Sequence, residues 1–258
     1  MEKKYNIMKG IMIVLVIILV GLIAFLVYDR LYNNESQKES NINNNSSNNN
    51  VVDNKKIIYD ADYKYDVDVT SYSTSYSTYY IDDIKVPYID IDSEDVKKIN
   101  TEIKNIFNDA VNNFKKGVND KMTYVDDCTY RYFTDDNILS VIITYGVGAT
   151  DVVYPKYYTY NIDLKTGNLM SYKDVYTYLD ISDIDNTVKR AITNAMKEKL
   201  SNIGDQFDTY NNESFNNYCE TLNNSTLKYF VDSNKKMNII VSLSIPAGRG
   251  SIDQIISL

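Results

Sequence analysis

The first hydrophobic segment of the chain is continuous, whereas the later ones are periodic. From Ile11 to Val27 the sequence contains only apolar residues and one glycine, and Tyr28 extends the run. No polar stripe interrupts it, as one would in a surface helix of a globular domain. Its length is about what a helix needs to cross the hydrocarbon core of a bilayer. We therefore predict a transmembrane helix over residues 11–28.

The charges that flank this run predict its orientation. Lys3, Lys4 and Lys9 precede it, and the residues that follow it carry no excess of positive charge. Because the more positive flank stays in the cytoplasm, residues 1–10 should form a cytoplasmic tail and the rest should be exported. A cleaved signal peptide is the alternative reading. An uncleaved anchor is favoured over it, because no small residues in a polar stretch follow the run to form a cleavage site.

A polar tract separates this run from the periodic part of the chain. Its centre, residues 41–50, reads Asn-Ile-Asn-Asn-Asn-Ser-Ser-Asn-Asn-Asn. Such a segment has almost nothing to bury and cannot offset the entropy cost of folding. Residues 29–55 are therefore predicted to be a disordered spacer.

The exported part begins with period-two alternation from Ile57 to Thr70, which predicts a half-buried strand. Its polar positions are mostly aspartates, which could also form a cation site. A solvated strand face is favoured, because calcium loops usually need a glycine turn as well. The Ser/Thr/Tyr tract 71–80 reads as a loop or a continued strand. Residues 84–87 read as a short edge strand that Pro87 ends.

The pattern then changes to helical spacing. Asp92 or Ser93 is a suitable N-cap, and Gly117 is a natural stop. Seven apolar positions recur between them at spacings of three and four: Val96, Ile99, Ile103, Phe107, Ala110, Val111 and Phe114. This stripe predicts a helix that covers a core rather than a cofactor site.

Three strands should follow this helix, at 124–133, 138–145 and 154–164. The middle one is β-branched and nearly continuous, so it should be buried on both faces. Turns are predicted at 135–137 and at 165–168, where Gly167 supplies a positive φ. A return strand should begin at 169–172.

The C-terminal part contains a helix from about Asp183 to Ile203, which Gly204 ends, and a shorter one near Glu213 to Leu222. A closing hairpin, residues 227–231 and 237–245, and a last edge strand at 252–258 complete the pattern. This order does not alternate as in a doubly wound sheet. It predicts an α+β fold over residues 56–258, with a mainly antiparallel sheet covered by two main helices and two possible sub-domains, 56–125 and 126–258.

Composition excludes several functional classes. The 258 residues contain no histidine and two cysteines, which removes histidine-dependent catalysis and four-thiolate metal sites. The net charge is -8; residues 1–30 contribute +2, so the rest carries -10. Such acidity argues against nucleic acid as a partner and favours a basic protein.

No residue stands out as a catalytic, cofactor-binding or metal-binding group. Gly146 and Gly148 lack the following basic helix of a phosphate loop. Cys128 and Cys219 could form a disulfide outside the cell, although Cys219 also fits a plain core position. The 25 tyrosines favour amphipathic packing, with a glycan- or peptide-binding groove as the alternative.

Several short strings together resemble a known family: Tyr130-Arg131-Tyr132, Asn137 to Val141, Tyr145 to Ala149, Tyr158 to Leu169, Asp174-Val175-Tyr176, Val86 to Ile89, Ile99-Asn100 and Pro246-Ala247-Gly248. They are similar to the exported domain of unknown function of RsiV-type anti-sigma factors. A related module precedes the catalytic domain of PdaC-type peptidoglycan deacetylases. The most specific string is Asn161-Ile162-Asp163-Leu164-Lys165-Thr166-Gly167.

The resemblance implies a membrane-tethered α+β ectodomain of a bacterial cell envelope that receives a signal by binding lysozyme, a basic protein. The turn that carries histidine in relatives reads Gly146-Val147-Gly148-Ala149-Thr150 here, and the deacetylase domain is absent. The ten-residue tail is too short to hold a sigma factor. We expect a non-catalytic binding or sensor domain for a protein or cell-wall component. The alternatives are a peptidoglycan hydrolase or accessory module that uses Asp/Glu, and an anti-sigma-type regulator that acts through a membrane partner.

Overall fold

The computed structural model describes residues 56–74, 77–149, 152–199, 204–245 and 251–258. Lys55–Leu258 form one compact unit. It is an α+β domain with antiparallel sheets, and its described residues contain four α-helices. The tail, anchor and spacer predicted for residues 1–55 lie outside the described residues, and their boundaries stay predictions. Within the described ranges, no helix has the length and apolarity that a membrane crossing requires.

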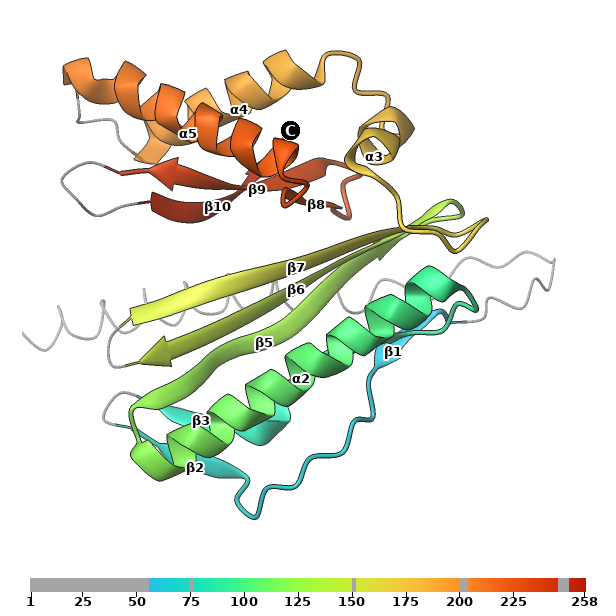
Figure 1. The fold of residues 1–258 in the computed structure, drawn as a ribbon, viewed down its shortest axis with the longest axis vertical. Helices are drawn as coiled ribbons and strands as arrows, with labels where there is room; N and C mark the ends of the chain where they lie inside the picture. Colours follow the sequence, from blue (N-terminus) through green and yellow to red (C-terminus); the bar gives the residue numbers. More distant parts are fainter. Residues whose placement is uncertain (1–55, 75–76, 150–151, 200–203, 246–250) are drawn as a thin grey trace, which may run out of the picture. The chain divides into compact units, whose positions relative to one another are not determined.

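A three-stranded antiparallel sheet forms the support for α2 (Figure 1). Its strands are β5 (Thr123–Thr134), β6 (Ile138–Ala149) and β7 (Val152–Asp163), in the order β5-β6-β7. The three strands confirm the sequence prediction. The central strand β6 is buried on both faces from Ile138 to Ile143, because α2 covers one face and a second sheet lies against the other.

Helix α2 (Glu94–Asp120) packs its apolar stripe onto this sheet. Ser93 is its N-cap, and the Ser93 hydroxyl accepts the Val96 N–H at 3.1 Å. The predicted end at Gly117 is wrong, because the helix continues to Asp120 and Lys121 takes the left-handed conformation. Gly117 instead permits a close approach. A Cβ atom there would lie 2.2 Å from the Thr123 carbonyl oxygen and from the Tyr72 hydroxyl.

The N-terminal segment is less regular than its alternation predicts. Only β1 (Ile58–Asp60) is a strand within 57–70, and it pairs with β4 (Pro87–Ile89). The longer prediction is wrong because the pairing stops after Ala61, whose N–H donates to the Val86 carbonyl at 2.9 Å, whereas Tyr63 and Val67 still pack against the core beneath α2. An extended segment that buries alternate residues has the same pattern as a strand. Pro87 starts β4 rather than ending a strand, in keeping with its missing N–H.

The Ser/Thr/Tyr tract forms a hairpin rather than one longer strand. It consists of β2 (Ser71–Ser73) and β3 (Thr78–Tyr80), and the short 3-10 helix η1 (Ile81–Asp83) follows. β2 and β3 pair in the antiparallel sense.

A second three-stranded sheet has the order β10-β9-β8. It contains β8 (Lys228–Val231), β9 (Met237–Ser244) and β10 (Ser251–Ser257), as predicted for the closing hairpin and the last strand. Helices α4 (Ile184–Lys199) and α5 (Phe207–Asn223) pack on it through an apolar cluster. Helix α5 begins earlier than predicted, because Phe207 and Tyr210 extend its apolar stripe.

The return strand predicted at 169–172 is wrong beyond its first residue. Leu169 forms a single bridge with Ile162, and helix α3 (Tyr172–Tyr178) then begins. Ser171 and Asp174 form a capping box, in which each side chain bonds the other's backbone N–H. This pair starts a helix where the apolar pattern alone suggests a strand.

Side chains of the first sheet cap the free edge of β8. The Thr159 hydroxyl accepts the Tyr229 N–H at 3.2 Å, and the Asn161 amide donates to the Tyr229 carbonyl at 2.8 Å. The Ser140 hydroxyl accepts the Val231 N–H at 2.7 Å and lies 2.7 Å from the Asn161 amide oxygen. Ser140 and Asn161 are almost completely buried. The two sheets are therefore joined by a buried polar contact as well as by apolar packing.

Asp135 forms a second junction between the two sheets. Its carboxylate accepts hydrogen bonds from the Tyr178 hydroxyl and, at 3.1 Å, from the Lys235 ammonium group. Burial alone would raise the pKa of Asp135, but these donors and the N–H groups of Asn137 and Ile138 lower it to about 2. The unfolded value is about 3.9, so this contribution to stability is present above about pH 4 and is lost as the pH falls toward 2.

Replacing Asn161 by alanine tests the contact that caps β8. We expect N161A to lower the free energy of unfolding by about 2–4 kcal/mol, because buried polar groups that lose a partner cost roughly 1–3 kcal/mol each. Urea denaturation followed by tyrosine fluorescence measures the change. Asn168 is exposed, and N168A should stay within about 0.5 kcal/mol of the wild type. Equal effects of the two substitutions would contradict the role of the Asn161 amide.

The close approach at Gly117 gives a second stability prediction. G117A should destabilise the domain by about 1–3 kcal/mol through overpacking, although alanine favours a helix by about 1 kcal/mol. The exposed α2 residue Asn105 provides the control, since N105A should be neutral or slightly stabilising. Thermal unfolding followed by circular dichroism compares them. A G117A protein more stable than the wild type would show that the helix can shift away from Thr123 at no cost.

Candidate functional site

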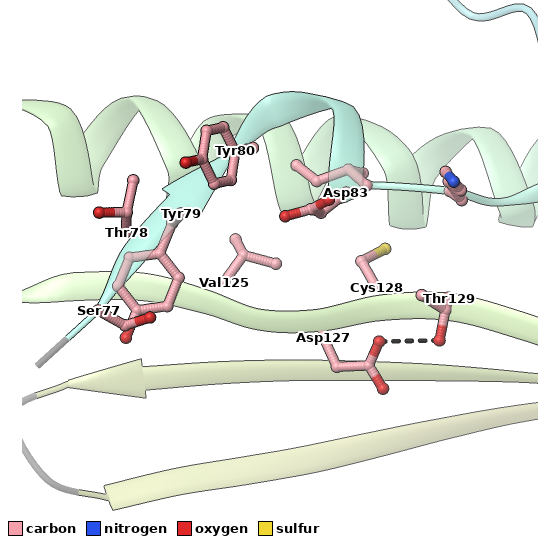
Figure 2. A pocket seen from close by; sticks show the side chains of 11 residues that line it. Ser77, Thr78, Tyr79, Tyr80, Asp83, Val125, Asp127, Cys128 and Thr129 are labelled. Carbon is pink, nitrogen blue, oxygen red and sulfur yellow. Dashed lines mark hydrogen bonds between the residues drawn. The ribbon is translucent and has the colours of Figure 1, made fainter. Parts of the chain in front are cut away.

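The candidate site is a pocket beside the outer edge of β5. Its volume is about 360 Å³, within the range of small-ligand pockets. β3 and the segment from η1 to Lys85 form one wall, and β5 forms the other (Figure 2). We call this pocket the β3–β5 slot. The residues that line it are Ser77, Thr78, Tyr79, Tyr80, Asp83, Ile84, Lys85, Val125, Asp127, Cys128 and Thr129.

The floor of the slot is apolar and its rim is polar. Val125 and Cys128 point from β5 toward the opposite wall (Figure 2), and with Ile84 they are buried. Asp83 and Lys85 are exposed at the rim. The Asp127 carboxylate accepts the Thr129 hydroxyl at 2.8 Å. An apolar base with a few polar groups around it is the usual character of a binding pocket.

A β-bulge shapes the β5 wall. The pairing of β5 with β6 shifts register between Val125 and Asp127. Such a bulge bends the strand and re-aims its side chains, and bulges are common at sheet edges near functional sites. Beyond the bulge, the Lys85 N–H donates to the Cys128 carbonyl at 2.7 Å and brings the two walls together. The slot therefore opens where the edge of β5 departs from regular geometry.

Tyrosines close the other end of the slot. Tyr79 stacks on Tyr124 with ring centroids 5.0 Å apart. The Tyr72 hydroxyl donates to the Thr123 carbonyl at 2.8 Å and accepts the Val125 N–H. Burial, with the nearby Tyr79 and Asp120, raises the pKa of Tyr72 to about 12, so the phenol stays neutral and can serve as both donor and acceptor.

Cys128 lies in the slot but is not a nucleophile. Burial, and to a smaller extent the charge of Asp127, raises the pKa of the Cys128 thiol to about 12. The thiolate is the reactive form of cysteine, so this side chain is inert at neutral pH. Cys128 belongs to the core beneath α2, whereas Cys219 packs against the core beneath α4 and α5. Both thiols are free, which resolves the disulfide left open by the sequence.

The other motifs singled out in the sequence have structural roles. Gly146 and Gly148 lie within β6 rather than in a turn, and a Cβ atom at Gly148 would lie 2.1 Å from the Tyr124 ring. Asp60 accepts the Tyr130 hydroxyl at 2.7 Å, and Asp62 pairs with Lys64 on the surface. Over the part of the chain that the structure describes, no three Asp, Glu, Cys or His side chains gather as metal ligands would.

Sequence reasoning did not identify the slot. One wall comes from the Ser/Thr/Tyr tract, whose sequence is compatible with a loop or with a strand. The other wall contains the β-bulge in β5, which the sequence pattern of that strand does not indicate. The part of the chain that contains β3 and η1 is acidic, with ten acidic residues against two lysines between residues 60 and 95, but of these ten only Asp83 lines the slot. Neither the comparison with protein-family profiles nor that with curated sequences finds a match to this chain.

The raised pKa of Cys128 predicts selective alkylation. With iodoacetamide at pH 8, Cys219 should be modified in the folded protein and Cys128 only after denaturation, because a pKa of about 12 leaves roughly one thiol in ten thousand ionised. Peptide mass spectrometry measures both sites, and C219S is the control. Rapid labelling of Cys128 in the native protein would contradict its burial.

Proposed function

We propose that this chain is a single-pass membrane protein whose extracytoplasmic α+β domain binds a basic protein of the cell envelope or its surroundings, without catalysing a reaction. The continuous apolar run at 11–28 supports an anchor whose N-terminus is cytoplasmic. The Asn/Ser-rich tract at 29–55 supports a flexible spacer that holds the domain away from the bilayer.

The observation that carries this proposal is the acidity of one segment of the domain, residues 60–95. Most of the ten acidic residues between 60 and 95 are exposed: Asp60, Asp62, Asp66, Asp68, Asp82, Asp83, Asp92 and Glu94. The two lysines of this segment are Lys64, which pairs with Asp62, and Lys85 at the rim of the slot. Lys97, just after the segment, pairs with Asp92 and Glu94. The excess negative charge therefore lies at the remaining exposed carboxylates: Asp60, Asp66, Asp68, Asp82 and Asp83.

Exposed negative charge favours binding of positively charged partners. It repels anionic wall polymers and nucleic acid, and it speeds the encounter with a cationic protein. The resemblance to RsiV-type ectodomains agrees with this choice, because lysozyme is the basic protein that the family implies. The contribution is electrostatic, so it should weaken as salt shortens the range of the field.

Calorimetry with lysozyme and with soluble peptidoglycan fragments tests this proposal. We expect lysozyme to bind and the affinity to fall at least severalfold when the ionic strength rises from about 0.05 to 0.5 M. The fragments should not bind appreciably. A variant with D66N, D68N and D82N should bind lysozyme more weakly, with thermal stability checked in parallel.

Two results would contradict the proposal. One is the absence of heat with lysozyme and with every other basic protein tried. The other is release of muropeptides from peptidoglycan by the purified protein, which would favour the hydrolase alternative.

A further inference from the structure

β3 has a main-chain edge that faces the β3–β5 slot. In its hairpin with β2, the Thr74 N–H donates to the Ser77 carbonyl at 2.9 Å, and the Ile81 N–H donates to the Thr70 carbonyl at 3.0 Å. Hydrogen-bonded pairs alternate along antiparallel strands, so the main-chain groups of Thr78 and Tyr80 point away from β2. Among the described residues, β3 pairs with β2 alone.

The opposite wall, the edge of β5, is closed at both ends of the slot. At one end, the Tyr72 hydroxyl donates to the Thr123 carbonyl and accepts the Val125 N–H. At the other end, the Lys85 N–H donates to the Cys128 carbonyl. These contacts protect the edge of β5 from a long neighbouring strand. The bulge lies between them, beside the pocket volume of about 360 Å³.

An extended peptide matches this edge better than a sugar does. Thr78 offers an N–H and a C=O, and Tyr80, one strand repeat or roughly 6.6–6.8 Å further along, offers an N–H, while the Tyr80 C=O accepts the first hydrogen bond of η1. A second strand presents its own donors and acceptors at this spacing. Addition of a strand to an exposed edge is a common mode of peptide recognition, with pockets for alternate side chains. The floor of Ile84, Val125 and Cys128 supplies such a pocket for an apolar side chain.

The charged residues at the slot indicate which second side chain a peptide ligand should carry. Asp83 lines it together with one cation, Lys85, and Asp82 is adjacent in η1, whereas the Asp127 carboxylate points to the other side of β5, where it accepts the Thr129 hydroxyl (Figure 2). A ligand with a basic side chain beside its apolar one therefore complements the slot.

We propose that the β3–β5 slot binds an extended peptide segment, with a basic and an apolar side chain, through the main-chain edge of β3. This inference rests on the proposed function, because the segment would belong to the basic partner protein. The ends of the slot limit the pairing to about three residues, so an isolated peptide binds weakly and the partner gains most of its affinity elsewhere.

The test uses the full chain in detergent micelles and a fluorescent probe peptide, acetyl-Thr-Lys-Val-Lys-Thr-amide. A twin peptide with every amide N-methylated keeps the side chains and charge but lacks the N–H donors. Fluorescence anisotropy should show saturable binding of the first peptide only. T78P removes the outward N–H without touching the ladder to β2, so it should weaken binding by about tenfold or more, whereas T78A should stay within about twofold.

A second measurement covers the case in which T78P misfolds. A diazirine on the valine position of the probe should label residues 77–80 or 125–129, mapped by mass spectrometry. D83N should weaken binding of the basic probe but not of a version with both lysines replaced by glutamine. Binding of the N-methylated twin at equal affinity, labelling elsewhere, or no binding of the first probe at millimolar concentration would overturn the proposal.

The lysozyme experiment separates this inference from the proposed function. Lysozyme binding that T78P leaves unchanged, in a protein that unfolds at the wild-type temperature, would overturn the slot as the partner's site and leave the proposed function standing. If the probe peptide binds at the slot but lysozyme does not bind the protein, the result would support the slot as a peptide-binding site and contradict lysozyme as the partner.

Discussion

The fold depends on how one short strand satisfies its free edge. Within the part of the chain that the structure describes, β8 pairs with one strand, β9, and its other edge lies against the face of the β5-β6-β7 sheet. Ser140, Thr159 and Asn161 provide the missing donors and acceptors from that face. An edge buried without such partners would cost several kilocalories per mole. These three side chains therefore allow the two sheets to share one unit, with the apolar contacts of Ile142, Phe230 and Ile240 beside them.

The same rule explains where the molecule has a site. Beside the slot, the outer edge of β5 is capped at Thr123 and Val125 by the Tyr72 hydroxyl, and at Cys128 by the main-chain N–H of Lys85. The bulge keeps the edge of β5 from being covered evenly along its length. Capped edges stabilise the unit and resist aggregation, whereas the outward edge of β3 lies at the pocket beside the bulge. The joining of the two sheets and the position of the candidate site thus both depend on which main-chain groups at strand edges have hydrogen-bond partners.

Periodicity predicted the elements with strong internal patterns. The stripe on α2, the three long strands, the Gly167 turn and the closing hairpin all lie where the sequence places them. It did not predict features that depend on contacts distant in the chain. Between Ala61, which bonds Val86, and Thr70, which bonds Ile81, the segment alternates because Tyr63 and Val67 pack against the core beneath α2. Ser171 and Asp174 start a helix through a local hydrogen-bonded box that the apolar pattern does not contain.

The division of the strands into separate sheets, and with it the slot, depends on pairings that no single-sequence pattern encodes. Asn161 illustrates this limit. In the sequence it belongs to the most specific string of the resemblance, but only the structure shows that it spans two sheets.

Amide hydrogen exchange at Tyr229 and Val231 tests the central structural claim most directly. These two N–H groups point away from β9 and would exchange quickly in an ordinary edge strand. If Thr159 and Ser140 hold them, both should exchange as slowly as the amides in the middle of β9. Exchange of either amide within the time of an exposed loop would contradict the joining of the two sheets through the edge of β8.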